Sequence, residues 1–322
     1  MIDLGTVMAV LAVLALVALI VLIAALWYTS PVLHPRSGTE LSFVNPASGG
    51  RQDFPSLLRD PATVDLSLIV PAYNEEKRID LMLEDALGVL EKRPAPFKYE
   101  VILVDDGSKD GTTAKGLDYV RKYGSDKIRV LTFTRNRGKG GAIRMGMLSA
   151  RGKYLLFADA DGATSFKDVV RLEDALKQHE AKNEHAMAIG SRAHMQDDAV
   201  ANRTLLRNIL MYGFHILVFL VGIRGIRDTQ CGFKMFTRPA ARVLFPAMHV
   251  ERWCFDIELL FLALRLGYPV AETAVNWQEI DGSKLDPIWS SVQMFKDILL
   301  IRLYYLFGIW QLPRSMDAKK VK

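Results

Sequence analysis

Residues 154–164 have the sequence YLLFADADGAT, an apolar run that ends in two carboxylates, Asp159 and Asp161. The apolar half is typical of a strand that is buried on both faces. The carboxylates offer hard oxygen ligands of the kind that Mg²⁺ or Mn²⁺ binds together with substrate phosphates. The alternative is a helix N-cap, for which Asp161 or Thr164 would serve. We predict a metal site, because polar clusters also follow the other expected strands.

Three further apolar runs resemble this strand, and helical patterns separate them. The expected strands are Leu66–Val70, Glu100–Val104 and Ile128–Phe133, and the expected helices are Glu75–Lys92, Asp110–Tyr123 and Gly138–Ala150. This alternation implies an α/β fold with a mostly parallel central sheet and helices on both sides. Ligands of such sheets bind beyond the carboxyl ends of the strands. The clusters PAYNEE, DDGSKDGT, TRNRGKGGA and DADGAT each follow a strand and therefore predict one shared site.

Two of these clusters have structural alternatives. Asp105 and Asp106, at a strand end, suit hydrogen bonds to a base or ribose, but Asp, Gly and Ser are also common turn residues. Residues 135–146, RNRGKGGAIRMG, lack the Lys-Ser or Lys-Thr of a P-loop and the third glycine of a dinucleotide fingerprint. Their amides and cations suit a diphosphate at a helix start. A purely structural glycine turn is the alternative.

The N-terminal segment predicts a membrane anchor. Residues 4–28 are almost wholly aliphatic, and no charged side chain lies between Asp3 and His34. A spanning helix needs about 20 such residues. A cleaved signal peptide would begin with basic residues, which this sequence lacks there. Because the first Lys or Arg is Arg36, the positive-inside rule leaves the rest of the chain in the cytosol. We expect a single-pass protein whose catalytic domain faces the cytosol.

The remaining organisation follows from composition along the chain. We expect an anchor at 1–29, a Pro-, Gly- and Ser-rich linker at 30–65, a catalytic domain at 66–284 and a C-terminal segment with a basic tail at 285–322. Apolar patterns near 203–223 and 289–310 suit amphipathic helices that lie in a membrane surface. Packing of these helices on the sheet is the alternative, because amphipathicity alone does not separate core from membrane.

Overall composition excludes several classes of protein. The chain has 322 residues, of which 50% are hydrophobic and 24% charged, so it is neither disordered nor collagen-like. Its net charge is +5, but the basic residues are scattered and accompany no nucleic-acid motif. Lipid headgroups or phosphorylated substrates are therefore the expected partners, rather than nucleic acid. Cys231 and Cys254 lack metal-binding spacing, which suits packing thiols in a reducing compartment.

Eight segments together resemble family 2 glycosyltransferases, specifically the branch of the endoplasmic reticulum that glucosylates dolichyl phosphate. They are SLIVPAYNEEKRI, VILVDDGSKDGT, NRGKGGAIRMGMLSARGKYLLFADADGAT, GSRAH, MYGFHILV, GIRDTQCGFKMFTR, HVERWCFDIELL and AVNWQEIDGSKL. The resemblance extends from the N-terminal segment to about Trp310. It implies a GT-A nucleotide-sugar-binding fold, UDP-glucose as donor, dolichyl phosphate as acceptor, and Mg²⁺ or Mn²⁺.

The resemblance also assigns residues to the donor. Those that would bind the nucleotide sugar are Pro71, Ala72, Tyr73, Glu75, Asp106, Lys139, Asp159 and Lys284. The first four would line the uridine pocket, Asp106 would bond the uracil, and Asp159 would contact the ribose side. Asp161 would hold the metal on the diphosphate, with Asp159 as the second carboxylate. Relatives that transfer mannose have a Gln where this sequence has Ala163, so Thr164 or water would complete the ligand set.

The other implied residues concern the acceptor and the reaction. The catalytic set would be Asp161, Asp228, Arg192 and Arg207, of which Arg192 (next to Ser191) and Arg207 would grip the acceptor phosphate. A phosphate monoester has a second pKa of about 6, so it is a nucleophile at neutral pH without a strong base. Cations, among them Lys284, would offset the Coulomb energy of bringing two anions together. The expected reaction is a single displacement with inversion, which gives a β-linked glucosyl phosphate.

Two alternative functions are open at the level of sequence. One is transfer of mannose or another sugar to a polyprenyl phosphate by the same fold. A processive polysaccharide synthase is disfavoured, because the chain lacks several further spanning helices and a Gln-x-x-Arg-Trp signature. The other is a non-catalytic membrane protein that binds a nucleotide sugar.

Overall fold

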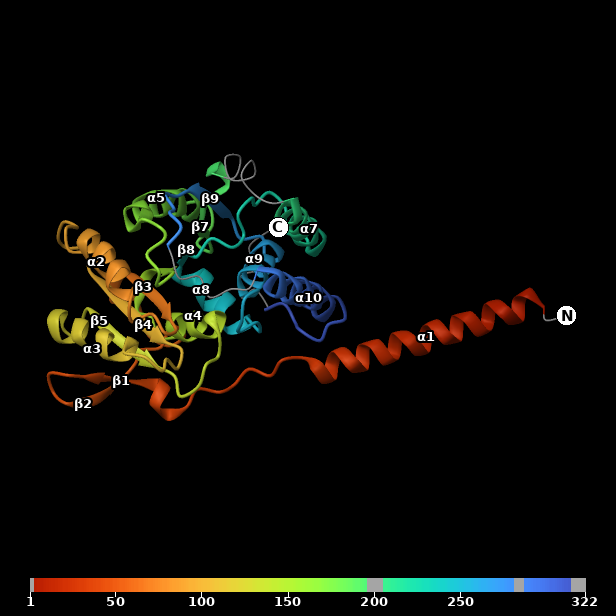
Figure 1. Cartoon of the computed structure of the whole chain (residues 1–322), viewed down its shortest axis with the longest axis horizontal. Helices are drawn as coiled ribbons and strands as arrows, with labels where there is room; N and C mark the ends of the chain where they lie inside the picture. The colour runs from red at the N-terminus through yellow and green to blue at the C-terminus, as the bar shows by residue number, and fades with distance from the viewer. Residues whose placement is uncertain (1–2, 196–204, 281–286, 314–322) are drawn as a thin grey trace.

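The computed structural model describes residues 3–195, 205–280 and 287–313. Within these residues a long helix, α1 (Leu4–Thr29), projects away from an α/β body that is built on a seven-stranded sheet (Figure 1). Among the described helices, α1 alone is long and apolar enough to cross a membrane, with a mean hydropathy of 3.3 over its best window. Its side chains over that window are unburied.

The central sheet brings the ends of its strands to one level. The strand order is β5, β4, β3, β6, β8, β7, β9. The strands are β3 (Val64–Ala72), β4 (Tyr99–Asp105), β5 (Ile128–Thr132), β6 (Gly152–Ala158), β7 (Met187–Ser191), β8 (Phe233–Thr237) and β9 (Val270–Ala274). Only β8 is antiparallel to its neighbours, so the predicted mostly parallel sheet is confirmed. Because Ala72 lies opposite Asp105, and Asp105 opposite Thr132, the carboxyl ends of β3, β4 and β5 are level.

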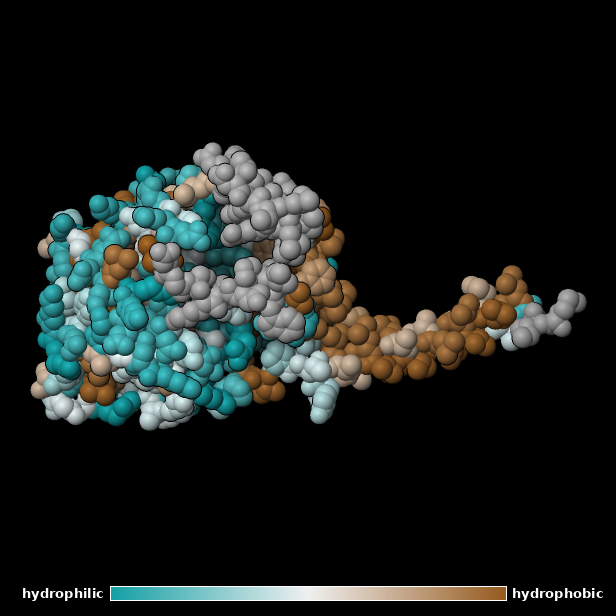
Figure 2. Space-filling view, in the orientation of Figure 1, coloured by the Kyte–Doolittle hydropathy of each residue, from teal (hydrophilic) through white to brown (hydrophobic). Residues whose placement is uncertain are grey.

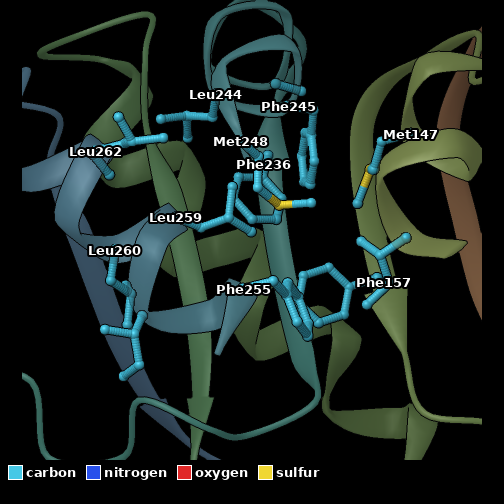
Figure 3. Packing of buried hydrophobic residues seen from close by; sticks show 14 of the residues in the cluster. Met147, Phe157, Phe236, Leu244, Phe245, Met248, Phe255, Leu259, Leu260 and Leu262 are labelled. Atoms are coloured by element: carbon cyan, nitrogen blue, oxygen red, sulfur yellow. The ribbon is translucent and has the colours of Figure 1, made fainter. Parts of the chain in front are cut away.

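Helices cover both faces of the sheet and close two hydrophobic cores. One face carries α2 (Ile79–Leu90), α3 (Thr112–Tyr123) and α5 (Val169–Glu180), and the other carries α4 (Lys139–Leu148), α8 (Arg238–Ala247) and α9 (Phe255–Arg265). Side chains of β3 alternate between the cores, since Leu68 packs in the first and Ile69 in the second. Figure 3 shows the second core, where Phe157 packs against Phe236 and Phe255.

Residues 30–63, within the expected linker at 30–65, lie between α1 and β3 and belong to the folded body. They form the short helix η1 (Gly38–Leu41) and a hairpin of β1 (Ser42–Asn45) and β2 (Gly50–Asp53). The segment also has a fully buried side chain, Leu57, whose carbonyl accepts hydrogen bonds from Arg238 and Arg242. The segment lacks apolar periodicity because arginines of the body, rather than a hydrophobic face, hold much of it.

Two more helices lie on the side of the body from which α1 leaves (Figure 1). They are α7 (Leu205–Val221) and α10 (Pro287–Leu306), which pack against each other. The end of α10 is bound to the end of α1: the Tyr304 hydroxyl donates to the carbonyl of Thr29 at 3.3 Å, and Trp310 Nε1 donates to Ser30 Oγ at 2.9 Å. The direction in which α1 leaves the body is therefore set by direct contacts. Two short helices, η2 (Phe166–Asp168) and η3 (Ala193–Met195), complete the described elements.

Candidate active site

The loops that follow β3, β4, β5 and β6 are joined to one another by polar contacts. The backbone N–H of Asn74, after β3, donates to Ser108 Oγ, after β4, at 2.8 Å. The loop after β5 contacts the loop after β6 through Lys139, whose Nζ lies 2.5 Å from Asp159 Oδ1. The loops after β4 and β5 meet at Asp106. The four predicted clusters thus form one continuous surface at the carboxyl edge of the sheet, as parallel topology requires.

Asp106 holds the loop after β5. Its side chain is buried, and Oδ1 accepts from the N–H of Arg137 at 2.6 Å while Oδ2 accepts from the N–H of Gly138 and from Asn136 Nδ2, both at 2.8 Å. Burial raises the pKa of Asp106 to about 6, although the backbone N–H groups favour its charged form. These contacts engage both oxygens, so a bond to a base would have to use a remaining lone pair.

The glycines of residues 138–141 are explained by close packing. Gly138 has φ +92°, and a Cβ there would lie 2.7 Å from the carbonyl oxygen of Glu251. A Cβ at Gly140 would lie 2.7 Å from the carbonyl oxygen of Val250. Larger residues would push α4 away from the segment that precedes α9. The structural alternative therefore accounts for the glycines, while the cation among them, Lys139, contacts the site.

Asp161 makes a turn rather than a helix cap. Its Oδ1 accepts from the backbone N–H of Ala163 at 3.0 Å, across Gly162, which has φ +72°. Burial raises the pKa of Asp161, and the negative charge of Asp159 raises it further. A cation at this place would lower that electrostatic cost. The ammonium of Lys139 is a cation that the structure places beside Asp159.

The chemistry of Asp159 and Asp161 fits a divalent cation that arrives with a diphosphate. Among the residues that the structure describes, no group of three or more His, Cys, Asp or Glu side chains could hold a metal by itself. Ala163 contributes no side-chain oxygen, and its carbonyl accepts from the N–H of Gln278 at 2.8 Å. Mg²⁺ in proteins is usually bound by one or two carboxylates together with substrate phosphates and water. This donor set is of that kind.

A second charged pair lies at the edge of the same surface. Arg192, which follows β7, donates from Nε to Asp228 Oδ2 at 2.7 Å and from Nη2 to Oδ1 at 2.9 Å. Burial opposes ionisation of Asp228, but the hydrogen bonds and charge of Arg192 outweigh it and hold the pKa of Asp228 below its ordinary value. Glu272 on β9 accepts from the N–H of Asp228 at 2.8 Å and from Ser191 Oγ at 2.6 Å. Asp228 therefore orients Arg192, and Glu272 in turn orients Asp228.

Trp277 lies between the pair of Arg192 and Asp228 and the turn that contains Asp161. Its backbone pairs with Thr164 in an isolated β-bridge, directly after the turn of Asp161. The guanidinium of Arg192 lies over its ring, 5.5 Å from the ring centre. Trp277 lies within the segment AVNWQEIDGSKL, but the sequence assigned it no role, because its contacts are with segments more than 80 residues away in the chain. The bridge and the ring together place Arg192 next to the turn that holds the paired carboxylates.

Two other pairs of charges lie within the quoted segments, but the motifs do not show which charges pair. Arg78 donates twice to Glu75, with both distances 2.7 Å, and the charges of Asp161 and Asp159 act on it. Below the site, the fully buried Lys234 lies 2.6 Å from Asp256 Oδ1. A three-residue spacing could have indicated the first pair. The second pair lies on separate elements, so no spacing could have indicated it.

The remaining predicted residues have varied environments. Pro71 and Ala72 are buried at the end of β3, and Ala72 packs in the first core, whereas Tyr73 is 38% exposed beyond the end of the strand. Arg207 lies on α7, but its side chain is outside the described part of the chain. Lys284 falls outside the described residues altogether.

Comparison with known proteins identifies the family of the chain. The family model described as glycosyl transferase family 2 matches residues 67–245. The dolichyl-phosphate beta-glucosyltransferase of Homo sapiens is 54% identical over 290 residues, which cover 88% of each chain. The chain belongs to glycosyl transferase family 2, in the dolichyl-phosphate beta-glucosyltransferase branch. The family 2 relatives of the same name from Drosophila melanogaster and Saccharomyces cerevisiae are 53% and 47% identical, over 88% and 79% of this chain and 88% and 78% of theirs.

Solved structures support the same fold. Glucosyl-3-phosphoglycerate synthase of Mycobacterium tuberculosis superposes with a TM-score of 0.53 at 18% identity, and the alignment covers 74% of this chain and 80% of that one. A complex of that enzyme with Mn²⁺, UDP-glucose and phosphoglyceric acid gives a TM-score of 0.53 at 19% identity, over 78% of this chain and 82% of that one. At such identity the likeness shows the fold alone. The expected GT-A fold of this family 2 chain is confirmed.

Proposed function

We propose that the protein transfers glucose from UDP-glucose to dolichyl phosphate with inversion and releases UDP and dolichyl β-D-glucosyl phosphate. The observation that carries this proposal is the 54% identity, over 88% of both chains, to a relative whose name states glucosyl transfer to dolichyl phosphate. The donor is supported by a fold neighbour that was crystallised with UDP-glucose and Mn²⁺. The product would be a donor for glucosylation of the N-glycan precursor.

The donor would bind across the loops after β3, β4, β5 and β6. Tyr73 and Glu75, with Asp106 behind them, would contact the uridine. Lys139 would bind the diphosphate, and Asp159 and Asp161 would hold Mg²⁺ or Mn²⁺ against it. When bound, this cation would stabilise the negative charge that grows on the departing UDP. The raised pKa of Asp161, caused by burial and by Asp159, is consistent with a position that binds a cation.

The acceptor phosphate would bind at the Arg192 side of the site. One of its oxygens would attack the anomeric carbon of glucose, and the bond from that carbon to the β-phosphate oxygen of UDP would break, with the electron pair leaving on UDP. Arg192, held by Asp228, would orient the incoming phosphate, with Arg207 and Lys284 as further cations. A single displacement converts an α-linked donor into a β-linked product.

The membrane-facing side would hold the site against the bilayer. We propose an anchor at 1–29, a catalytic domain at 66–284 that faces the cytosol at the endoplasmic reticulum, and interfacial helices near 203–223 and within 285–322. Apolar side chains are exposed on the two helices on the side from which α1 leaves. They are Ile216, Phe219 and Leu220 on α7, and Val292, Phe295 and Leu299 on α10. Figure 2 shows that the apolar surface of α1 continues onto this side of the body. Such a surface fits lipid headgroups and acyl chains.

A donor panel tests the proposed reaction. Purified full-length protein is incubated with dolichyl phosphate and with radiolabelled UDP-glucose, UDP-galactose, UDP-N-acetylglucosamine or GDP-mannose. We expect label in the lipid product only from UDP-glucose, with β configuration by NMR. Transfer only from GDP-mannose would establish the mannosyl alternative, and binding of UDP without any transfer would establish a non-catalytic protein.

A further inference from the structure

The segment that leaves α1 is bound to the loop that Asp106 holds. We define residues 34–40 as the juxtamembrane strap. Arg137 donates from Nη1 to the carbonyl of His34 at 3.0 Å, and from Nη2 to the carbonyl of Pro35 at 3.1 Å and to Glu40 Oε2 at 2.6 Å. The side chains of Arg137 and Glu40 are 3% and 0% exposed. The contact is thus a buried ion pair reinforced by two backbone carbonyls.

The juxtamembrane strap has its own internal bonds. Glu40 Oε2 accepts from the N–H of Ser37 at 2.9 Å, which closes a capping box at η1. Arg36 donates to the carbonyl of Glu40 at 3.0 Å and to Ser149 Oγ, at the end of α4, at 2.6 Å. The guanidinium of Arg137 also lies over the ring of Phe133, 5.1 Å from its centre. These bonds give Arg137 one fixed position between the strap and the sheet.

The backbone of Arg137 faces the proposed donor site. Its N–H donates to Asp106 Oδ1 at 2.6 Å, and the next residue, Gly138, donates to Oδ2. The residue after that, Lys139, begins α4 and pairs with Asp159. Residues 137–139 therefore connect the juxtamembrane strap with two carboxylates of the proposed donor site, Asp106 and Asp159.

We infer that Arg137 is a positioning residue through which the juxtamembrane strap sets the geometry of the nucleotide-sugar site. This inference rests on the proposed donor site. Removing the charge of Glu40 takes away the direct ion-pair partner of the buried guanidinium, which is costly in a site of low dielectric. The carboxylate of Glu251, whose charge also acts on Arg137, then becomes a competing partner. Arg137 then moves toward other acceptors or water and displaces its own backbone. Asp106 and Lys139 shift with it, so the donor binds less tightly.

The test uses full-length Glu40→Gln and Arg137→Lys, with Glu100→Gln as the matched control. The pair of Arg129 and Glu100 has the same length, 2.6 Å, and the same exposures, 3% and 0%, but lies at the start of β4, away from the site. The readouts are the thermal midpoint, the Kd of UDP by equilibrium dialysis with Mn²⁺, and KM and kcat for UDP-glucose. We expect Glu40→Gln and Arg137→Lys to raise the UDP Kd and donor KM on the order of tenfold, with a smaller change in kcat.

The control separates positioning from stability. Glu100→Gln should lower the thermal midpoint and leave the UDP Kd unchanged. The inference is overturned if folded Glu40→Gln binds UDP as tightly as wild type, or if Glu100→Gln weakens UDP binding equally. If Arg137→Lys does not fold, Glu40→Gln decides, because it keeps the size of the side chain. If wild type itself fails to bind UDP, the proposed donor is wrong and the inference falls with it.

Discussion

Lys139 Nζ lies 2.5 Å from Asp159 Oδ1, which joins the first residue of α4 to the first carboxylate after β6. In the proposed donor complex, the same ammonium would contact the diphosphate at the carboxyl edge of the sheet. Burial and the charge of Asp159 raise the pKa of Asp161, and the positive charge of Lys139 opposes this rise. Without Lys139, the repulsion between the two carboxylates would therefore be larger. Under the proposed function, the pair would therefore favour a diphosphate that binds together with a cation.

Lys139→Met should weaken donor binding. Because the ammonium offsets the charge of Asp159 and would contact the diphosphate, we expect the KM for UDP-glucose to rise on the order of tenfold or more. The measurement is steady-state transfer to a short polyprenyl phosphate. Lys127→Met is the control, since Lys127 forms a surface pair with Glu91 in which both side chains are at least 40% exposed. An unchanged KM in Lys139→Met would contradict this role.

Asp161→Ala should abolish transfer in a protein that still folds. The carboxylate is the one that we assign to the metal on the diphosphate, so we expect kcat to fall on the order of a thousandfold. Circular dichroism checks the fold, and electron paramagnetic resonance of Mn²⁺ in the presence of UDP checks the metal. Full activity, or undiminished Mn²⁺ binding, would rule out the assignment.

Arg192→Lys should act on the acceptor rather than on the donor. Lysine is unable to make the two-pronged contact with Asp228, so the cation loses its fixed position. We expect the KM for the acceptor to rise about tenfold to a hundredfold. Asp228→Asn should give a similar but smaller change, because it leaves the guanidinium in place. A rise confined to the KM for UDP-glucose would assign Arg192 to the donor instead.

Asp106 should give stability a distinct pH dependence. Burial raises its folded pKa to about 6 from an ordinary value of 3.8, so the folded state binds this proton more tightly than the unfolded state. The group therefore lowers stability as pH rises from about 4 to 6, by about 1 to 3 kcal/mol. Denaturant unfolding of wild type and Asp106→Asn at several pH values isolates the effect. Wild type should lose stability relative to the variant over this window, and a constant difference would refute the prediction.

Deletion of residues 1–28 should affect the acceptor in the membrane and spare the chemistry. The truncated protein keeps the juxtamembrane strap, and therefore the contact of Glu40 with Arg137. We expect a large loss of transfer to dolichyl phosphate in vesicles, because a polyprenyl chain does not leave the bilayer. Turnover on a short, soluble polyprenyl phosphate should be unchanged. An equal loss on both acceptors would show that α1 supports the fold of the site itself.

Several features of the protein could be predicted from local sequence. The strands and helices follow from apolar runs and helical periodicity, and their observed bounds differ from the expected ones by a few residues; α2, for example, begins at Ile79 rather than Glu75. The folded position of residues 30–65 has no signal in the local sequence, because it depends on arginines such as Arg137 and Arg238 rather than on an apolar pattern. Hydrogen bonds to backbone carbonyls leave no mark in the composition of the segment that accepts them.

The sequence by itself determined that four polar clusters share one edge, because parallel strands with helical crossovers must all end on the same side of the sheet. It also determined the paired carboxylates and the apolar helix. Only the tertiary structure decided which charges meet: Lys139 with Asp159, Arg192 with Asp228, and Glu40 with Arg137. The members of these pairs lie on different elements, and local patterns carry no record of a partner across the sheet. Burial and chain topology, acting together, select those partners.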